Sequence, residues 1–215
     1  MARSWWGRGK APAGSRRYFG FCLVVRYKRC FGLGVSMGLS ASRVEYALPG
    51  LAVLEQTPII IEKIVHLAND DQMQWKPSAE RWSISEVLAH LADVEVKGFR
   101  ERVEKMVESE SPALEAYDQN AAYAAGHYSS KKAIENLHTF CHERDRSLSF
   151  LRYLPATALS RSGKHAKLGA ITVGQLMNEW AFHDLGHIRQ ISELLRSRAF
   201  FPYIGPFQQY YTIRP

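Results

Sequence analysis

The sequence contains little cysteine and no long apolar run. Its 215 residues include 3 cysteines, and two of them, Cys22 and Cys30, lie near the N-terminus, so Cys141 stands alone in the rest of the chain. A single cysteine excludes a disulfide framework there and suits a reducing compartment, which makes a cytoplasmic location our expectation. No apolar run approaches the roughly 20 residues that a membrane-spanning helix needs. The sequence therefore predicts neither a disulfide-stapled protein nor a membrane protein.

Acidic residues are absent from the first 44 positions, which hold nine of the 28 lysines and arginines. The remaining chain has 19 basic and 21 acidic residues, so the net charge of +7 belongs to the N-terminal segment. No helix expected after that segment carries a basic stripe of the kind that follows a phosphate backbone. Nucleic acid is therefore not an expected partner.

Residues 1–36 are rich in glycine, arginine and aromatic side chains and show no helical period. Three interpretations stay open: translation that in fact begins at Met37, a targeting signal, and a disordered basic tail. The targeting signal is suggested by S-R-R-Y-F at positions 15–19, which resembles a twin-arginine motif, although the apolar run after it is short. We expect residues 1–36 to be dispensable for folding and residues 37–215 to form one domain.

Apolar spacing with a helical period predicts four long helices after Met37, and no stretch shows the alternation of a strand. The expected helices start at Thr57-Pro58, run from Ile84 to Glu108, from Ser129 or Ser130 to Tyr153, and from Val173 to Arg198. These elements predict an all-α protein, a four-helix bundle. The connection 109–128 is long enough to cross the bundle, so the second and third helices need not be antiparallel neighbours.

Two histidines occupy the centre of an apolar helix face in the last of these segments. His183 and His187 are four residues apart, so they lie one above the other on the helix. A buried imidazole without a partner costs roughly 1–3 kcal/mol, which a neighbouring acceptor or a metal ion can offset. The zinc-protease pattern H-E-x-x-H is disfavoured, because Asp184 stands where that pattern has glutamate.

A third histidine, His90, belongs to the second expected helix. That helix begins with a capping box, in which Ser83 and Glu86 satisfy each other's backbone N–H groups. The last helix begins in the same way, with Thr172 and Gln175. Two capped helices with inward histidines could form a three-histidine metal site with an open fourth position, which is the catalytic rather than the structural type.

The chain resembles the DinB-like (DinB/YfiT-like) superfamily of metal-dependent four-helix bundles over roughly residues 53–198. The resemblance rests on the order and spacing of several motifs. These are W-K-P at 75–77, W-S at 82–83, H-L-A-D-V-E at 90–95, L-G-A-I-T at 168–172 and H-D-L-G-H-I-R-Q at 183–190.

This resemblance implies that His90, His183 and His187 bind one divalent metal ion, with zinc or nickel favoured and manganese or iron as alternatives. It implies a metal-dependent enzyme acting on a small molecule, either a transferase that uses a low-molecular-weight thiol or a metal-assisted hydrolase. A non-catalytic metal- or ligand-binding protein linked to stress stays open as the alternative, and a homodimer is compatible with the sequence.

Glu179 lies one turn before His183 and is our candidate catalytic residue. It could serve as a general base, as a further ligand, or as an acceptor for a ligand's N–H. Gln190 is expected to orient the site, and Asp93 could accept an imidazole N–H from His90. The connection 109–128, the stretch 155–170 and the aromatic tail 200–211 are expected to contribute to a pocket wall.

Overall fold

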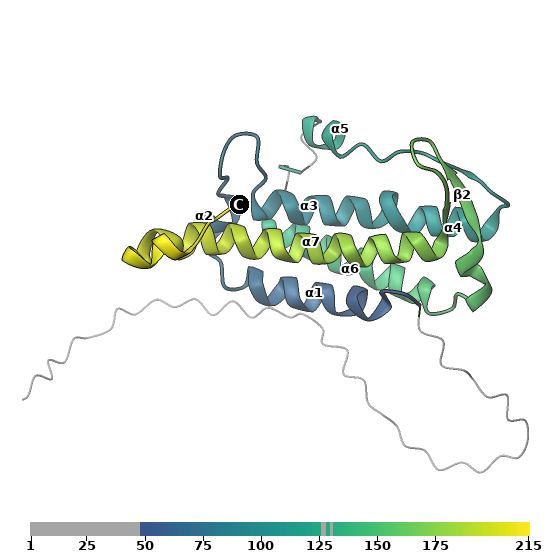
Figure 1. Ribbon diagram of the computed structural model, residues 1–215, viewed down its shortest axis with the longest axis horizontal. Helices are drawn as coiled ribbons and strands as arrows, with labels where there is room; N and C mark the ends of the chain where they lie inside the picture. The colour runs from purple at the N-terminus through teal and green to yellow at the C-terminus, as the bar shows by residue number, and fades with distance from the viewer. Residues whose placement is uncertain (1–47, 126–127, 130) are drawn as a thin grey trace, which may run out of the picture. The chain divides into compact units, whose positions relative to one another are not determined.

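The computed structural model describes residues 48–125, 128–129 and 131–215, so our predictions for residues 1–36 lie outside the described residues. Four helical segments pack side by side (Figure 1). They are α1 (Leu51–Val65), a continuous helix made of α3 (Ile84–Val94), η1 (Glu95–Arg100) and α4 (Glu101–Glu108), α6 (Ala133–Leu151) and α7 (Val173–Ala199). The predicted four-helix bundle is confirmed.

The second and third long helices run parallel, which is the less common arrangement for consecutive helices in a bundle. Contacts between them advance in the same direction, from Asn136 with Ser85, to Arg144 with Glu95, to Ser147 with Arg100. A parallel pair requires the chain to return along the bundle before the third helix begins. The connection that does so carries β1 (Ala113–Leu114) and α5 (Gln119–Ala124), and it confirms the predicted crossover (Figure 1).

Helix α1 begins earlier than predicted. Thr57 and Pro58 were expected to start it, but the helix begins at Leu51 and Pro58 lies inside it. A proline has no N–H for the carbonyl four residues earlier, which here belongs to Leu54. The guanidinium of Arg144 donates to that carbonyl from Nη1 at 2.8 Å, so the acceptor that Pro58 leaves free is satisfied from another helix. This contact explains how the proline is tolerated.

Both predicted capping boxes are present. Ser83 Oγ accepts from the backbone N–H of Glu86 and the Glu86 carboxylate accepts from that of Ser83. Thr172 and Gln175 repeat the arrangement at the start of α7. Asn69 caps the short helix α2 (Asp70–Gln74) with a third capping box, completed by Gln72. These local signals fix where the two histidine-bearing helices begin.

The expectation that no strand is present was wrong. Three short strands form one sheet in the order β1-β2-β3, in which β2 (Ser162–His165) pairs antiparallel with β3 (Gly169–Thr172) and parallel with β1. The strands are two to four residues long, too short for alternating polarity to show in the sequence. Gly163 permits the close approach, since a Cβ there would lie 2.7 Å from Leu114 Cδ1.

The helix 84–108 is not regular throughout, because η1 is a π-helical segment in its middle. Such a segment widens the helix and shifts the face that later residues present, and it is frequent at functional sites. Here Phe99 stacks on Trp180 with ring centroids 4.9 Å apart, and Glu95 accepts from Trp180 Nε1 at 3.1 Å. The π segment therefore lies directly against α7.

The bundle has two apolar core clusters with a buried ionic group between them. One cluster includes Trp180 and the other includes Phe140. The Arg144 guanidinium packs between these two rings, 5.7 and 5.0 Å from their centroids. Its charge is met by Glu95 and Asp184, both 1% exposed. Among the described residues, no helix is both long enough and apolar enough to cross a membrane.

Candidate metal centre

The structure brings the three predicted histidines together. His90 Nε2 lies 3.2 Å from His183 Nε2, and His187 Nε2 lies 3.1 Å from the same atom. In the described part of the chain, this is the one group of three or more histidine, cysteine or acidic side chains with ligand atoms gathered within 4.8 Å. The antiparallel helices α3 and α7 supply the residues, and each imidazole presents Nε2 to the others.

A chain of hydroxyl groups fixes the protonation of His90. Tyr117 donates its hydroxyl proton to Asp93 Oδ2 at 2.6 Å. The 2.5 Å contact between the two tyrosine hydroxyls must therefore use the proton of Tyr128. The oxygen of Tyr128 is left to accept from His90 Nδ1, at 3.2 Å. His90 is thus the tautomer with its proton on Nδ1, and its Nε2 carries a free lone pair.

Asp93 acts at a greater distance than expected. We predicted that it could accept directly from an imidazole, but the two tyrosines lie between the carboxylate and His90. Lys97 binds the other carboxylate oxygen at 2.7 Å. Burial is the main cause that raises the pKa of both tyrosines, so both hydroxyls stay protonated at neutral pH. The sequence placed Tyr117 and Tyr128 in a candidate pocket wall and gave no sign of this relay.

Gln190 orients His187 as expected. Its carbonyl oxygen can only accept, so the 2.8 Å contact with His187 Nδ1 is a bond donated by the imidazole. The Nε2 of His187 therefore also carries a free lone pair. This contact confirms the predicted orienting contact of Gln190 with the histidine.

Of the three histidines, His183 is the one whose Nδ1 lacks a hydrogen-bond partner in the described part of the chain. Its Nδ1 is buried and has no hydrogen-bond partner among the described residues. If its proton is on Nδ1, the Nε2 atoms of all three histidines carry lone pairs that point toward one another. If the proton is on Nε2, that atom can donate to only one of its two neighbours, and Nδ1 becomes an unsatisfied acceptor. The three histidines therefore cannot satisfy all of their hydrogen-bonding groups by bonds to one another.

Burial keeps the three imidazoles neutral. It is the main cause that lowers the pKa of His90 to about 2 and that of His183 to about 3, and the neighbouring imidazoles lower both further. Burial also lowers the pKa of His187, against the opposite effects of Gln190 and Asp184. Neutral imidazoles with available lone pairs are the form that binds metal ions.

Two cavities meet at the cluster. The larger, about 740 Å³, is lined by His90 and His183 together with Tyr117, Gln119 and residues of the β2–β3 hairpin. The other, about 620 Å³, is lined by His183, His187 and Gln190. The predicted contributions of the connection 109–128 and the stretch 155–170 are confirmed, since both reach the larger cavity. No residue of the tail 200–211 lines either cavity, so that part of the prediction was wrong.

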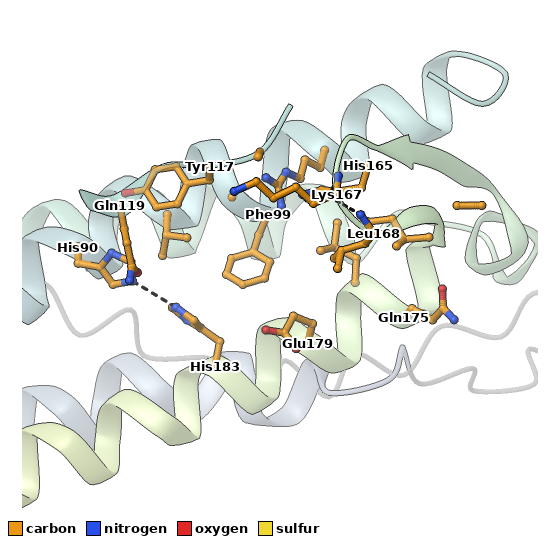
Figure 2. Close-up of a pocket in the computed structure, with 17 residues that line it drawn as sticks. His90, Phe99, Tyr117, Gln119, His165, Lys167, Leu168, Gln175, Glu179 and His183 are labelled. Carbon is orange, nitrogen blue, oxygen red and sulfur yellow. Dashed lines mark hydrogen bonds between the residues drawn. The ribbon is translucent and has the colours of Figure 1, made fainter. Parts of the chain in front are cut away.

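Glu179 is exposed and lines both cavities together with His183. Its carboxylate is outside the three-histidine group. Figure 2 shows Glu179 one turn from His183 on the same side of the cavity. It forms no hydrogen bond or ion pair with another described residue, so its carboxylate is available to a bound molecule. Its catalytic role stays a prediction.

Fold and site together define a four-helix bundle with an inward cluster of three histidines facing a cavity. The DinB superfamily model matches residues 54–191, more than half of the chain, and the chain belongs to that family. This confirms the resemblance seen in the motifs.

Three relatives from bacilli show what the chain is similar to. A candidate metal-dependent hydrolase of Oceanobacillus iheyensis is 26% identical over 150 residues, which cover 67% of this chain and 83% of that protein. YfiT of Bacillus subtilis, described in the same terms, is 26% identical over 153 residues, covering 68% and 82%. The uncharacterised YuaE of Bacillus subtilis is 28% identical over 142 residues, covering 59% and 85%.

A solved structure agrees on the fold. YfiT from Bacillus subtilis, described as having an unusual four-helix bundle topology, superposes with a TM-score of 0.64 at 22% identity. The match covers 77% of this chain and 93% of that one. At this identity the likeness establishes the fold, while the chemistry must be argued from the residues of this chain.

Proposed function

We propose that the protein is a metal-dependent hydrolase that acts on a small molecule in the larger cavity. One observation carries the proposal: three neutral imidazoles turn Nε2 toward one point and cannot satisfy one another there. The two Nε2–Nε2 separations, 3.2 and 3.1 Å, are close to the roughly 3.3 Å edge of a tetrahedron with metal–nitrogen bonds of about 2.0–2.1 Å. A divalent cation would meet all three lone pairs.

The residues around the cluster fit such an ion. His90, His183 and His187 would hold it, and Tyr128 and Gln190 keep the Nδ1 protons of two of them in place. The buried group of Arg144, Glu95 and Asp184 carries one more negative than positive charge directly beside the cluster, which favours a cation. When bound, a divalent cation supplies a Lewis acid that polarises a carbonyl or phosphoryl oxygen and lowers the pKa of water.

Glu179 supplies the proton transfer in this proposal. Its exposed carboxylate faces the cavity beside His183 and can accept a proton from the attacking water and return it to the leaving group. The relay from His90 to Asp93 does not take that proton, because it ends in a hydroxyl already donated to the carboxylate. In this proposal Glu179 transfers the proton and does not bind the metal, so its role in catalysis can be tested separately from metal binding.

The experiment is a hydrolysis screen of the metal-loaded protein with small esters, amides and phosphate esters, run with and without low-molecular-weight thiols. We expect turnover without thiol that is lost in Glu179→Gln, while its metal content equals that of the wild type. Gln175→Glu provides a control, because it alters charge on the same cavity wall one turn further away. Equal turnover in wild type and Glu179→Gln would remove Glu179 from the mechanism.

Transfer of a thiol to an electrophile is the other activity that the family resemblance implies. The same screen separates the two, since turnover that requires the thiol and consumes it would replace the hydrolase proposal. Metal binding with no turnover on any substrate class would favour the non-catalytic alternative. The choice of zinc or nickel over manganese or iron, the cytoplasmic location and the homodimer stay predictions from the sequence.

A further inference from the structure

The larger cavity has a basic wall on the side away from the three-histidine cluster. Arg102 of α4 and His165 and Lys167 of the β2–β3 hairpin line it. Figure 2 shows His165 and Lys167 across the cavity from Glu179, which is the one acidic side chain among the described residues of the lining. The two ends of the cavity therefore differ in charge.

Two of these basic side chains have no carboxylate partner in the described part of the chain. Within the described ranges, neither Arg102 nor Lys167 forms an ion pair with a carboxylate. Arg102 donates from Nη2 to the backbone carbonyl of Glu115 at 2.7 Å, which fixes its guanidinium and leaves further N–H donors. Burial lowers the pKa of Arg102, and no neighbouring carboxylate opposes that effect. An unpaired guanidinium in a partly buried wall is a binding group for an oxyanion.

His165 adds an oriented donor to the same wall. Its Nδ1 accepts from the backbone N–H groups of Lys167 and Leu168, at 3.2 and 3.3 Å. The neutral ring therefore has its proton on Nε2, which is a donor. Burial is the main cause that lowers the pKa of His165, and the charges of Arg102 and Lys167, which line the same cavity, lower it further.

The rest of the cavity between the two ends is largely apolar. Its volume of about 740 Å³ is in the usual range for small-molecule sites, roughly 300–1,000 Å³. The apolar residues come from η1 and its flanks, from the hairpin and from the start of α7: Val94, Phe99, Leu168, Ile171 and Leu176. The lining thus suits a molecule with an apolar body and one charged end.

We propose that the cavity selects small molecules with a carboxylate or phosphate group at one end, held by Arg102, His165 and Lys167, and an apolar body that extends toward the three histidines. The direction in which the body points rests on the proposed function, whereas the oxyanion site does not. For a hydrolase, the acidic group would lie on the part of the substrate away from the bond that is broken.

The test compares two probes of similar shape, 4-phenylbutyrate and 4-phenylbutan-1-ol, by titration calorimetry with the full-length protein. We expect the acid to bind roughly tenfold more tightly than the alcohol, and the preference to shrink as salt is added. 3-Phenylpropyl phosphate, tested alongside, shows whether the wall favours phosphate over carboxylate; tighter binding than the alcohol by either oxyanion supports the proposal. Equal affinity for all three probes, or no binding by any of them, would overturn it.

Variants locate the site. Lys167→Gln should remove most of the preference for the acid, and it should fold normally, because the Lys167 side chain forms no hydrogen bond with a described residue. Lys164→Gln is the matched control, since Lys164 is an exposed lysine of the same hairpin outside the cavity lining. Arg102→Gln should act like Lys167→Gln, with thermal melting to verify its fold. If Lys164→Gln weakens acid binding as much as Lys167→Gln, the charge effect is general and the site is refuted.

Metal removal separates this proposal from the proposed function. An acid could also bind a metal ion directly, so the titrations are repeated after chelation and with His183→Ala. A preference that survives both changes belongs to the basic wall, whether or not the protein proves to be a metalloenzyme. A preference that disappears with the metal would assign the acidic group to the histidine cluster and contradict the proposal.

Discussion

The hydroxyl groups of Tyr117 and Tyr128 lie 2.5 Å apart and connect His90 to the carboxylate of Asp93. The two tyrosines belong to the crossover connection and its end, while His90 and Asp93 are on α3. The parallel helix pair makes this possible, because it requires the connection to run back along the bundle past the start of α3. The crossover thus supplies the groups that set the tautomer of one histidine.

Tyr128→Phe should weaken metal binding roughly 10–100-fold, which is typical when an outer partner of a ligand histidine is removed. The variant leaves the Nδ1 proton of His90 without its acceptor, so the ring is no longer held in the binding tautomer. Affinity is measured at neutral pH by competition with a coloured chelator. Tyr123→Phe is the control, since the Tyr123 hydroxyl accepts from Lys76 and is outside the relay. Unchanged affinity in Tyr128→Phe would show that the relay has no part in binding.

Arg144→Met should lower the free energy of unfolding by about 3–5 kcal/mol, because it leaves two buried carboxylates without their cationic partner and the Leu54 carbonyl without its donor. Urea denaturation measures the change. Arg146→Met on the same helix removes an exposed partner of Glu143 and should cost about 0–1 kcal/mol. Similar losses in the two variants would mean that the buried group is not a structural centre of the bundle.

Metal-free protein should lose stability as the pH falls below about 6.5. The folded state keeps His90 and His183 neutral, with pKa values of about 2 and 3, while the unfolded chain protonates them near 6.5. The unfolded state therefore binds more protons between pH 6.5 and about 3, and stability falls through that range. Urea denaturation at several pH values checks this. The double variant His90→Ala, His183→Ala should show a shallower slope, and an equal slope would contradict the assignment.

Features that depend on neighbouring residues could be predicted from the sequence. The capping boxes at Ser83 and Thr172 fixed two helix starts, and the four-residue spacing of His183 and His187 placed both on one face. The length of the connection after Glu108 allowed the crossover. Each of these signals lies within a short segment, and the family spacing added His90 to the pair.

Features that depend on contacts between distant segments could not be predicted. Pro58 was interpreted as a helix start, because nothing near it in the sequence shows that Arg144 replaces the lost donor. Strand β2 pairs in parallel with β1, whose residues Ala113 and Leu114 lie about 50 residues earlier in the chain than their partners. The tyrosine relay likewise joins residues of α3 to the far end of the connection, and single-segment patterns carry no trace of it.

The central claim is that His90, His183 and His187 hold one divalent cation. Elemental analysis of untagged protein, before and after chelation and paired with thermal melting, tests it most directly. We predict about one divalent metal ion per chain, a lower melting temperature after chelation, and loss of both the metal and the chelator effect in His183→Ala. His142→Ala, at an exposed histidine outside the cluster, should change neither. Protein that contains no metal and cannot be loaded, or metal that stays in His183→Ala, would contradict the account.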